Sequence, residues 1–133
     1  MSKFDAVIQK IKDEEVQYVD FRFTDMRGKM QHVTFDVGMV DVEALEEGIM
    51  FDGSSIAGWK AINESDMVMM PDPDSVTIDP FYQQTTLAIV CDILEPGTLK
   101  PYNRCPRGMG KKAEAYVKSS GIGDTAFFGP EAE

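Results

Sequence analysis

Residues 19–37 read V-D-F-R-F-T-D-M-R-G-K-M-Q-H-V-T-F-D-V, and this stretch predicts a β-hairpin. Apolar and polar side chains alternate on both sides of residues 25–28, as in strands with one buried face. Gly28 can adopt the left-handed backbone conformation that a short bulged turn requires. The apolar positions are Val19, Phe21, Phe23, Val33, Phe35 and Val37.

Other strands are expected on both sides of a proline-rich turn. Residues 85–93 (T-T-L-A-I-V-C-D-I) are apolar almost throughout, which is typical of a buried central strand. Shorter strands are predicted at 67–70 and 76–78, around the turn at 71–74. The methionines of residues 67–70 are interpreted as core filling.

Three helices complete an α+β pattern. The first runs to Asp13 or Glu14, with Ser2 and Asp5 spaced as a capping box. Its apolar face consists of Phe4, Val7, Ile8 and Ile11. A short helix is expected at 41–47, closed by Gly48.

A linker-like stretch from residue 96 to 106 marks a boundary, after which Pro106 can open a third helix that ends at Gly121. One face of this helix carries Met109, Ala113, Tyr116 and Val117. Residues 126–133 are predicted to form a final strand. The chain therefore divides into two parts, 1–103 and 104–133.

Charge is distributed unevenly along the 133 residues, which carry a net charge of −10. Ten acidic residues oppose one lysine between Asp36 and Ser75, whereas residues 100–118 carry six basic side chains and one acidic one. The overall charge disfavours nucleic-acid and anionic membrane partners. An acidic region attracts cations, although it also serves solubility alone.

The cysteine and histidine content restricts the chemistry further. Two cysteines, Cys91 and Cys105, and an opening without an apolar secretion segment favour a reduced, cytoplasmic protein. No apolar run approaches the length of a membrane span. The single histidine, His32, excludes a multi-histidine metal site and is interpreted as a surface or hydrogen-bonded residue.

Glu131 and Glu133 form one candidate site. Two residues apart on a strand, they would project from one face with Cα atoms about 6.6–7 Å apart. Such carboxylates can each hold one of two divalent ions in phosphoryl transfer. The alternative is a solvated strand face.

Asp52 is the second candidate, in the non-periodic stretch F-D-G-S-S-I-A-G-W of residues 51–59, which is interpreted as a shaped loop. Ser54 and Ser55 can form hydrogen bonds beside it, and Trp59 offers an aromatic wall. This loop could bind a small cation or accept its proton. The alternative is an Asx-turn that only shapes the loop.

Four motifs, in order, resemble the amino-terminal region of type I bacterial glutamine synthetase, the glutamate–ammonia ligase. They are Lys29-x-x-His32-Val33-Thr34, residues 51–59, Pro71-Asp72-Pro73, and residues 107–133 with Phe128-Gly129-Pro130-Glu131-x-Glu133. This resemblance implies a β-grasp amino-terminal domain, residues 1–103, followed by the first helix and strand of a catalytic domain. It also implies ATP-dependent synthesis of glutamine from glutamate and ammonium through γ-glutamyl phosphate.

The resemblance assigns roles to five residues. Asp52 looks like the aspartate that binds ammonium and helps to remove its proton, with Ser55 beside it and Trp59 lining that side. Glu131 and Glu133 resemble ligands of two Mg²⁺ or Mn²⁺ ions. In the family this loop serves the adjacent subunit, and type I enzymes form two stacked six-membered rings, so one 133-residue chain is expected to be inactive.

Two other hypotheses stay open at this point. One is a stand-alone β-grasp interaction module, and the other is an acidic, cation-binding domain without catalysis.

Overall fold

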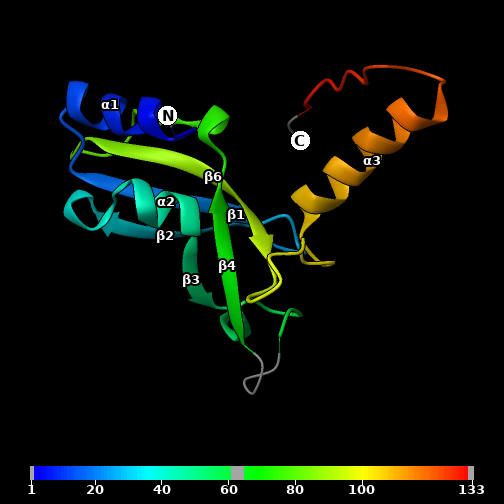
Figure 1. The fold of residues 1–133 in the computed structure, drawn as a ribbon, viewed down its shortest axis with the longest axis horizontal. Coiled ribbons are helices and arrows are strands. Elements are labelled where there is room, and N and C mark those ends of the chain that lie inside the picture. The colour runs from blue at the N-terminus through cyan, green and yellow to red at the C-terminus, as the bar shows by residue number, and fades with distance from the viewer. Residues whose placement is uncertain (1, 61–64, 132–133) are drawn as a thin grey trace.

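A computed structural model of the chain describes residues 2–60 and 65–131. Helices α1 (Asp5–Asp13) and α2 (Val42–Glu47) accompany a six-stranded mixed sheet, and α3 (Pro106–Ser120) follows it. The strands are β1 (Tyr18–Thr24), β2 (Met30–Asp36), β3 (Ile49–Asp52), β4 (Asp66–Pro71), β5 (Thr77–Asp79) and β6 (Thr86–Leu94). Single 3₁₀ turns occupy Val37–Met39, Gly53–Ser55 and Pro73–Ser75. Figure 1 shows α3 projecting on the opposite side of the molecule from α1 and α2.

The hairpin predicted from residues 19–37 is confirmed. Strands β1 and β2 pair antiparallel, with Phe21 opposite Val33, and Gly28 has a φ of 80° in the turn between them. The predicted central strand is also confirmed, because β6 pairs with β1 on one side and with β4 and β5 on the other. The pairing with β1 is parallel, whereas the pairings with β4 and β5 are antiparallel.

Strands β4 and β5 flank the proline-rich turn as expected, but they do not form a hairpin with each other. Strand β4 pairs with the end of β6, from Cys91 to Leu94, and β5 pairs with its beginning, from Thr86 to Ala88. The sequence predicts a loop at Phe51 and Asp52, and the structure corrects this. In the structure they end β3, which pairs with β4 and is one edge of the sheet.

The helices begin and end close to the predicted positions. At the start of α1 the backbone N–H of Ser2 donates to the Asp5 carboxylate at 2.9 Å, and the Ser2 hydroxyl accepts from the Phe4 N–H at 3.1 Å. The Asp41 carboxylate caps α2 through the N–H of Ala44, at 2.8 Å. Gly48 and Gly121 follow the last residues of α2 and α3, as predicted.

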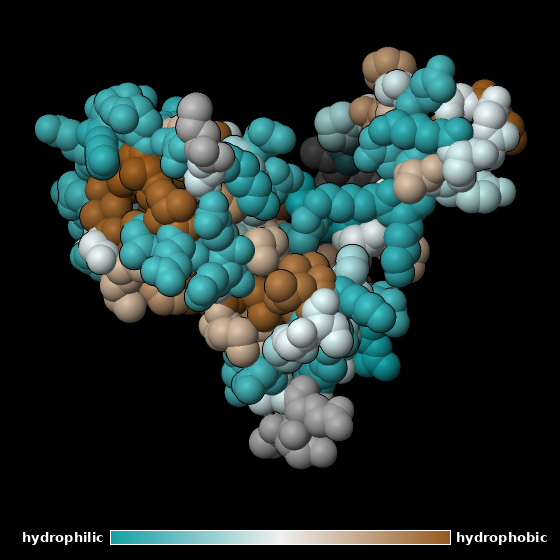
Figure 2. All heavy atoms as spheres, in the orientation of Figure 1, coloured by the Kyte–Doolittle hydropathy of each residue, from teal (hydrophilic) through white to brown (hydrophobic). Residues whose placement is uncertain are grey.

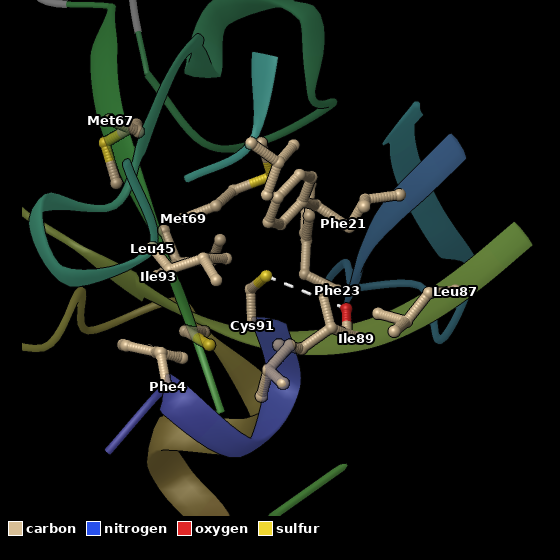
Figure 3. Close-up of a cluster of buried hydrophobic side chains, with 14 of the residues drawn as sticks. Phe4, Phe21, Phe23, Leu45, Met67, Met69, Leu87, Ile89, Cys91 and Ile93 are labelled. Carbon is tan, nitrogen blue, oxygen red and sulfur yellow. Dashed lines mark hydrogen bonds between the residues drawn. The ribbon is translucent and has the colours of Figure 1, made fainter. Parts of the chain in front are cut away.

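The core lies between the sheet and helices α1 and α2. Figure 3 shows Phe4, directly before α1, and Leu45 from α2 in one cluster with strand residues such as Phe21, Met69 and Ile93. All five side chains are at most 1% exposed. Figure 2 shows apolar side chains reaching the surface between α1 and α2. Burial of this kind contributes about 1.5–3 kcal/mol for each large apolar side chain, and it is the main stabilising term of the fold.

The segment after β6 differs from the predicted open linker. Tyr102 and Cys105 are buried and belong to the core cluster, and the Tyr102 N–H donates to the Ile93 carbonyl at 2.9 Å. Helix α3 has no buried residue, and Met109 and Tyr116 on its apolar face are 56% and 71% exposed. The boundary between residues 103 and 104 stays a prediction.

The strand predicted at 126–133 is wrong for the residues that the structure describes. Residues 126–131 have no strand conformation, and residues 132 and 133 lie outside the described ranges. A strand needs a hydrogen-bonded neighbour, but the six strands of the sheet all precede this segment and pair with one another. Phe127 and Phe128 are more than 90% exposed as a result.

Among the described residues, no helix combines the length and apolar character of a membrane span.

Candidate active-site loop

The Asp52 side chain lies at the point where β3 becomes a 3₁₀ turn. Its carboxylate accepts the backbone N–H of Ser54 at 2.8 Å and the Ser54 hydroxyl at 2.6 Å. These two hydrogen bonds, with a smaller contribution from the Ser65 side chain, hold the pKa of Asp52 below its usual value. Because hydrogen bonding favours the charged form, this exposed group is a carboxylate at neutral pH. The hydrogen bond from the Ser54 N–H to the Asp52 carboxylate is that of the Asx-turn given above as the alternative. The turn both shapes the loop and holds an exposed negative charge in place.

Close backbone approach holds the beginning of the loop against β4. The Gly53 N–H donates to the Ser65 carbonyl at 2.7 Å. A Cβ at position 53 would lie 2.5 Å from Met67 Cγ and 2.9 Å from the Ser65 carbonyl oxygen, so only glycine fits without a shift. Asp52 is thereby positioned by the residue that follows it as well as by β3.

A second carboxylate lies across the strand pair from Asp52. In the β3–β4 register Asp52 is opposite Asp66, and both residues are exposed. Like charges at opposite positions destabilise a strand pair slightly. They also make this end of the sheet more attractive to a cation. Sequence patterning missed Asp66, because the predicted strand began one residue later and β3 itself was not expected.

Trp59 is buried beneath the loop instead of forming an exposed wall. Its side chain is 5% exposed, with ring centroids 5.3 Å from Phe23, 6.3 Å from Phe51 and 5.3 Å from Tyr102. The Trp59 Nε1 atom is buried and has no hydrogen-bond partner among the described residues. In this structure the indole supports the loop from within, and its role in lining a substrate site stays a prediction. Ser55, the other predicted loop residue, is exposed.

Two basic residues hold the far end of the loop. Arg104 Nη1 donates to the Gly58 carbonyl and also to the Trp59 carbonyl, the latter at 3.3 Å. Lys60 Nζ lies 2.8 Å from the Glu95 carboxylate and 5.4 Å from the centroid of the Tyr102 ring. These contacts join the loop to the segment between β6 and α3. No sequence motif pointed to Arg104.

The structure describes only one of the two predicted metal ligands. Glu131 is exposed in an irregular segment, and Glu133 lies outside the described residues. Within residues 2–60 and 65–131, no group of three or more His, Cys, Asp or Glu side chains could hold a metal ion. The described residues therefore do not fit a divalent metal by themselves.

The histidine expected to be hydrogen-bonded is part of a buried ionic cluster around Asp20. Asp20 has no exposed surface, and its carboxylate contacts Arg22 Nε at 2.6 Å, His32 Nδ1 at 2.7 Å and the Thr34 hydroxyl at 2.7 Å. Arg22 also donates to Asp79 at 2.6 Å. Burial raises the pKa of Asp20, but the hydrogen bonds from Thr34, Arg22 and His32 outweigh it, and the net shift is downward. This cluster joins β1, β2 and the end of β5 on the sheet face opposite the apolar core.

Comparisons with known proteins agree on one family. Residues 15–96 match the family model described as glutamine synthetase, beta-Grasp domain. The chain is 68% identical over 127 residues to a glutamine synthetase of Bradyrhizobium diazoefficiens, covering 96% of this chain and 27% of that protein. It is 60% identical over 133 residues to a glutamine synthetase of Rhizobium meliloti, covering all of this chain and 28% of the relative.

A solved structure of the same family also matches, at lower sequence identity. The glutamine synthetase of Plasmodium falciparum superposes with a TM-score of 0.79 at 28% identity, over 91% of this chain and 23% of that one. The chain thus spans about a quarter of the length of the relatives it matches.

Proposed function

The chain belongs to the glutamine synthetase family, whose amino-terminal β-grasp region it matches, and we propose that it supplies the ammonium-binding loop of a glutamate–ammonia ligase. In that reaction ATP converts the side-chain carboxylate of glutamate to γ-glutamyl phosphate, and ammonia displaces phosphate to give glutamine. The relatives named above are all glutamine synthetases, so the matches do not favour a stand-alone interaction module.

The single observation that carries this proposal is the geometry of Asp52. Its carboxylate is exposed at a strand end, fixed by Ser54 and charged at neutral pH. Asp66 adds a second negative charge opposite it. Such a site attracts ammonium, and the lowered pKa makes Asp52 a better cation ligand than proton acceptor. Asp52 therefore holds and orients the ammonium ion, with Ser55 beside it, and helps to remove one proton, which frees the lone pair with which ammonia attacks γ-glutamyl phosphate.

The remaining groups of the reaction are assigned by family resemblance. Glu131 and Glu133 are proposed as ligands of two Mg²⁺ or Mn²⁺ ions, and Trp59 as a residue on the substrate side of the loop. Because the described residues do not form a metal site, the rest of the catalytic apparatus must come from elsewhere in the enzyme. We further propose a cytoplasmic homo-oligomer of two stacked six-membered rings, in which the loop serves the neighbouring subunit. The 133-residue chain alone is then inactive.

The test is the variant Asp52→Asn in the full-length synthetase. The amide keeps the size of the side chain but removes its charge, so the KM for ammonium rises while the KM for ATP is unchanged. Asp74→Asn is a matched control, because Asp74 is an exposed acid away from the loop. An equal loss of ammonium and ATP affinity would contradict the assigned role, as would glutamine formation by the isolated chain.

A further inference from the structure

The loop that carries Asp52 is held separately at its two ends. At its beginning, the Gly53 N–H donates to the carbonyl of Ser65, the residue before β4, at 2.7 Å. This end of the loop is therefore attached to the start of β4. At its far end the chain turns at Gly58, which has a φ of 82°, and Arg104 bonds to the two carbonyls at positions 58 and 59. The far end therefore depends on a residue that is far along the chain and is not part of the sheet.

The contacts around Arg104 form a small clamp on the loop. Trp59 fills the space between Phe23, Phe51 and Tyr102, so the ring cannot move without disturbing all three. Lys60 reaches Glu95, the residue directly after β6, and lies over the Tyr102 ring. Arg104 adds the hydrogen bonds that satisfy the carbonyls of this turn, which would otherwise depend on water.

The clamp residue Arg104 lies two residues before the start of α3, and α3 is itself fixed to the sheet. Arg107 in the first turn of α3 donates to Asp92 of β6 at 2.8 Å and to Asp72 of the turn after β4. Lys111, one turn later, also contacts Asp92. The side chains of Arg107, Asp72 and Asp92 are 28%, 23% and 21% exposed, so these ion pairs are partly shielded from solvent. The beginning of α3 is therefore a fixed point, and Arg104 connects the loop to it.

We propose that Arg104 is a positioning residue for ammonium use: it ties the Gly58–Trp59 end of the Asp52 loop to the beginning of α3 and so holds Asp52 in its binding position. This inference rests on the proposed function of Asp52. Arg104 does not touch the ammonium ion; it acts through the loop backbone. A single nitrogen, Arg104 Nη1, donates to both the Gly58 and the Trp59 carbonyl. A lysine at position 104 can therefore keep part of this contact, whereas a glutamine is shorter and uncharged and loses it.

The first experiment compares Arg104→Gln, Arg104→Lys and Asp52→Asn in the full-length synthetase. Arg104→Gln should raise the KM for ammonium about tenfold, since small displacements of a reacting group have large effects. The KM values for glutamate and ATP, and kcat at saturating ammonium, should stay near those of the unmodified enzyme. Arg104→Lys should recover part of the ammonium affinity. Lys100→Gln, which removes an exposed charge of the same sign nearby, is the control and should change none of these values.

The second experiment uses Trp59, the only tryptophan of these 133 residues, as a reporter of the clamp in the full-length synthetase, with any tryptophan beyond residue 133 replaced by phenylalanine. Its emission should shift to longer wavelength, and its quenching by acrylamide should increase, in Arg104→Gln but not in Lys100→Gln. Unchanged Trp59 emission would overturn the proposal. An ammonium KM that is unchanged, or that rises together with the KM values for glutamate and ATP, would also overturn it.

The two proposals can fail separately. If Asp52→Asn leaves ammonium use intact, the function proposed for the loop is wrong. If Asp52→Asn impairs ammonium use and both Arg104 variants do not, the loop function stands and the positioning role of Arg104 is refuted.

Discussion

Replacing Gly53 by alanine tests how strictly the backbone approach beneath Asp52 is required. The new Cβ would lie 2.5 Å from Met67 Cγ and 2.9 Å from the Ser65 carbonyl oxygen. The methionine side chain can rotate away, but the carbonyl belongs to the backbone that accepts the Gly53 N–H at 2.7 Å. The loop must therefore move away from β4, or this hydrogen bond must lengthen.

The size of the effect follows from these two contacts. Overpacking of a well-packed site costs about 1–3 kcal/mol, and weakening one backbone hydrogen bond costs about 0.5–1.5 kcal/mol. The two costs overlap, because one displacement of the loop causes the loss of the hydrogen bond and relieves the overpacking. We expect the free energy of unfolding to fall by about 2 kcal/mol. Urea unfolding of the chain, followed by Trp59 fluorescence and by circular dichroism, measures this loss. In the full-length synthetase the same variant should raise the KM for ammonium.

Gly110→Ala is the matched control for this substitution. Gly110 lies inside α3 with no atom within 4 Å of an added Cβ, so alanine there should leave the stability unchanged or raise it by up to about 1 kcal/mol. If Gly53→Ala costs no more than Gly110→Ala, the loop is not held by its approach to β4, and the account of how Asp52 is positioned is wrong.

Two further predictions concern buried groups. The pKa of Asp20 is lowered in the folded chain, so Asp20 stabilises the fold above its unfolded pKa of about 4, and this contribution is lost as pH falls through the lower folded pKa. Urea unfolding at a series of pH values should show that loss, and Asp20→Asn should reduce it; an identical pH profile would refute the prediction. Burial raises the pKa of the Cys91 thiol, and Cys105 is 2% exposed, so a thiol reagent should modify neither residue until the chain unfolds. Fast modification of the native chain would contradict this.

Most of the fold could be predicted from the pattern of apolar residues, which alternates with polar residues in the hairpin and is nearly continuous in the buried central strand. The β1–β2 hairpin follows from Phe21 and Val33, and β6 follows from the apolar run that ends at Ile93. Strand β3 escaped detection since it has four residues and continues directly into the Gly53 turn. The strand predicted at 126–133 shows the opposite error, because strand propensity cannot supply a neighbouring strand.

The site was predicted only in part, because the residues that support it come from distant segments. Asp52 and Ser55 stood out through their motif, but Arg104 has no local pattern that links it to residue 58. Asp20 occupies a polar position in the alternation of β1, which indicates solvent exposure, yet it is completely buried. The signal was available in the register, since Arg22, His32 and Thr34 provide the hydrogen bonds that a buried carboxylate requires.

The arrangement of β6 has a consequence for how the chain acquires its structure. The β1–β2 and β3–β4 pairs can form early, because each joins strands that follow one another in the chain and closes a far shorter loop than the pairing of β1 with β6. Tyr18 cannot meet Thr86 until nearly all of the sheet-forming chain is present, and this parallel pairing closes the longest loop in the domain. On the ribosome the edges of β1 and β4 that pair with β6 stay unpaired until β6 emerges. Pairing of β6, the last strand of the sheet to be synthesised, therefore joins the separate strand pairs into one cooperative folding unit.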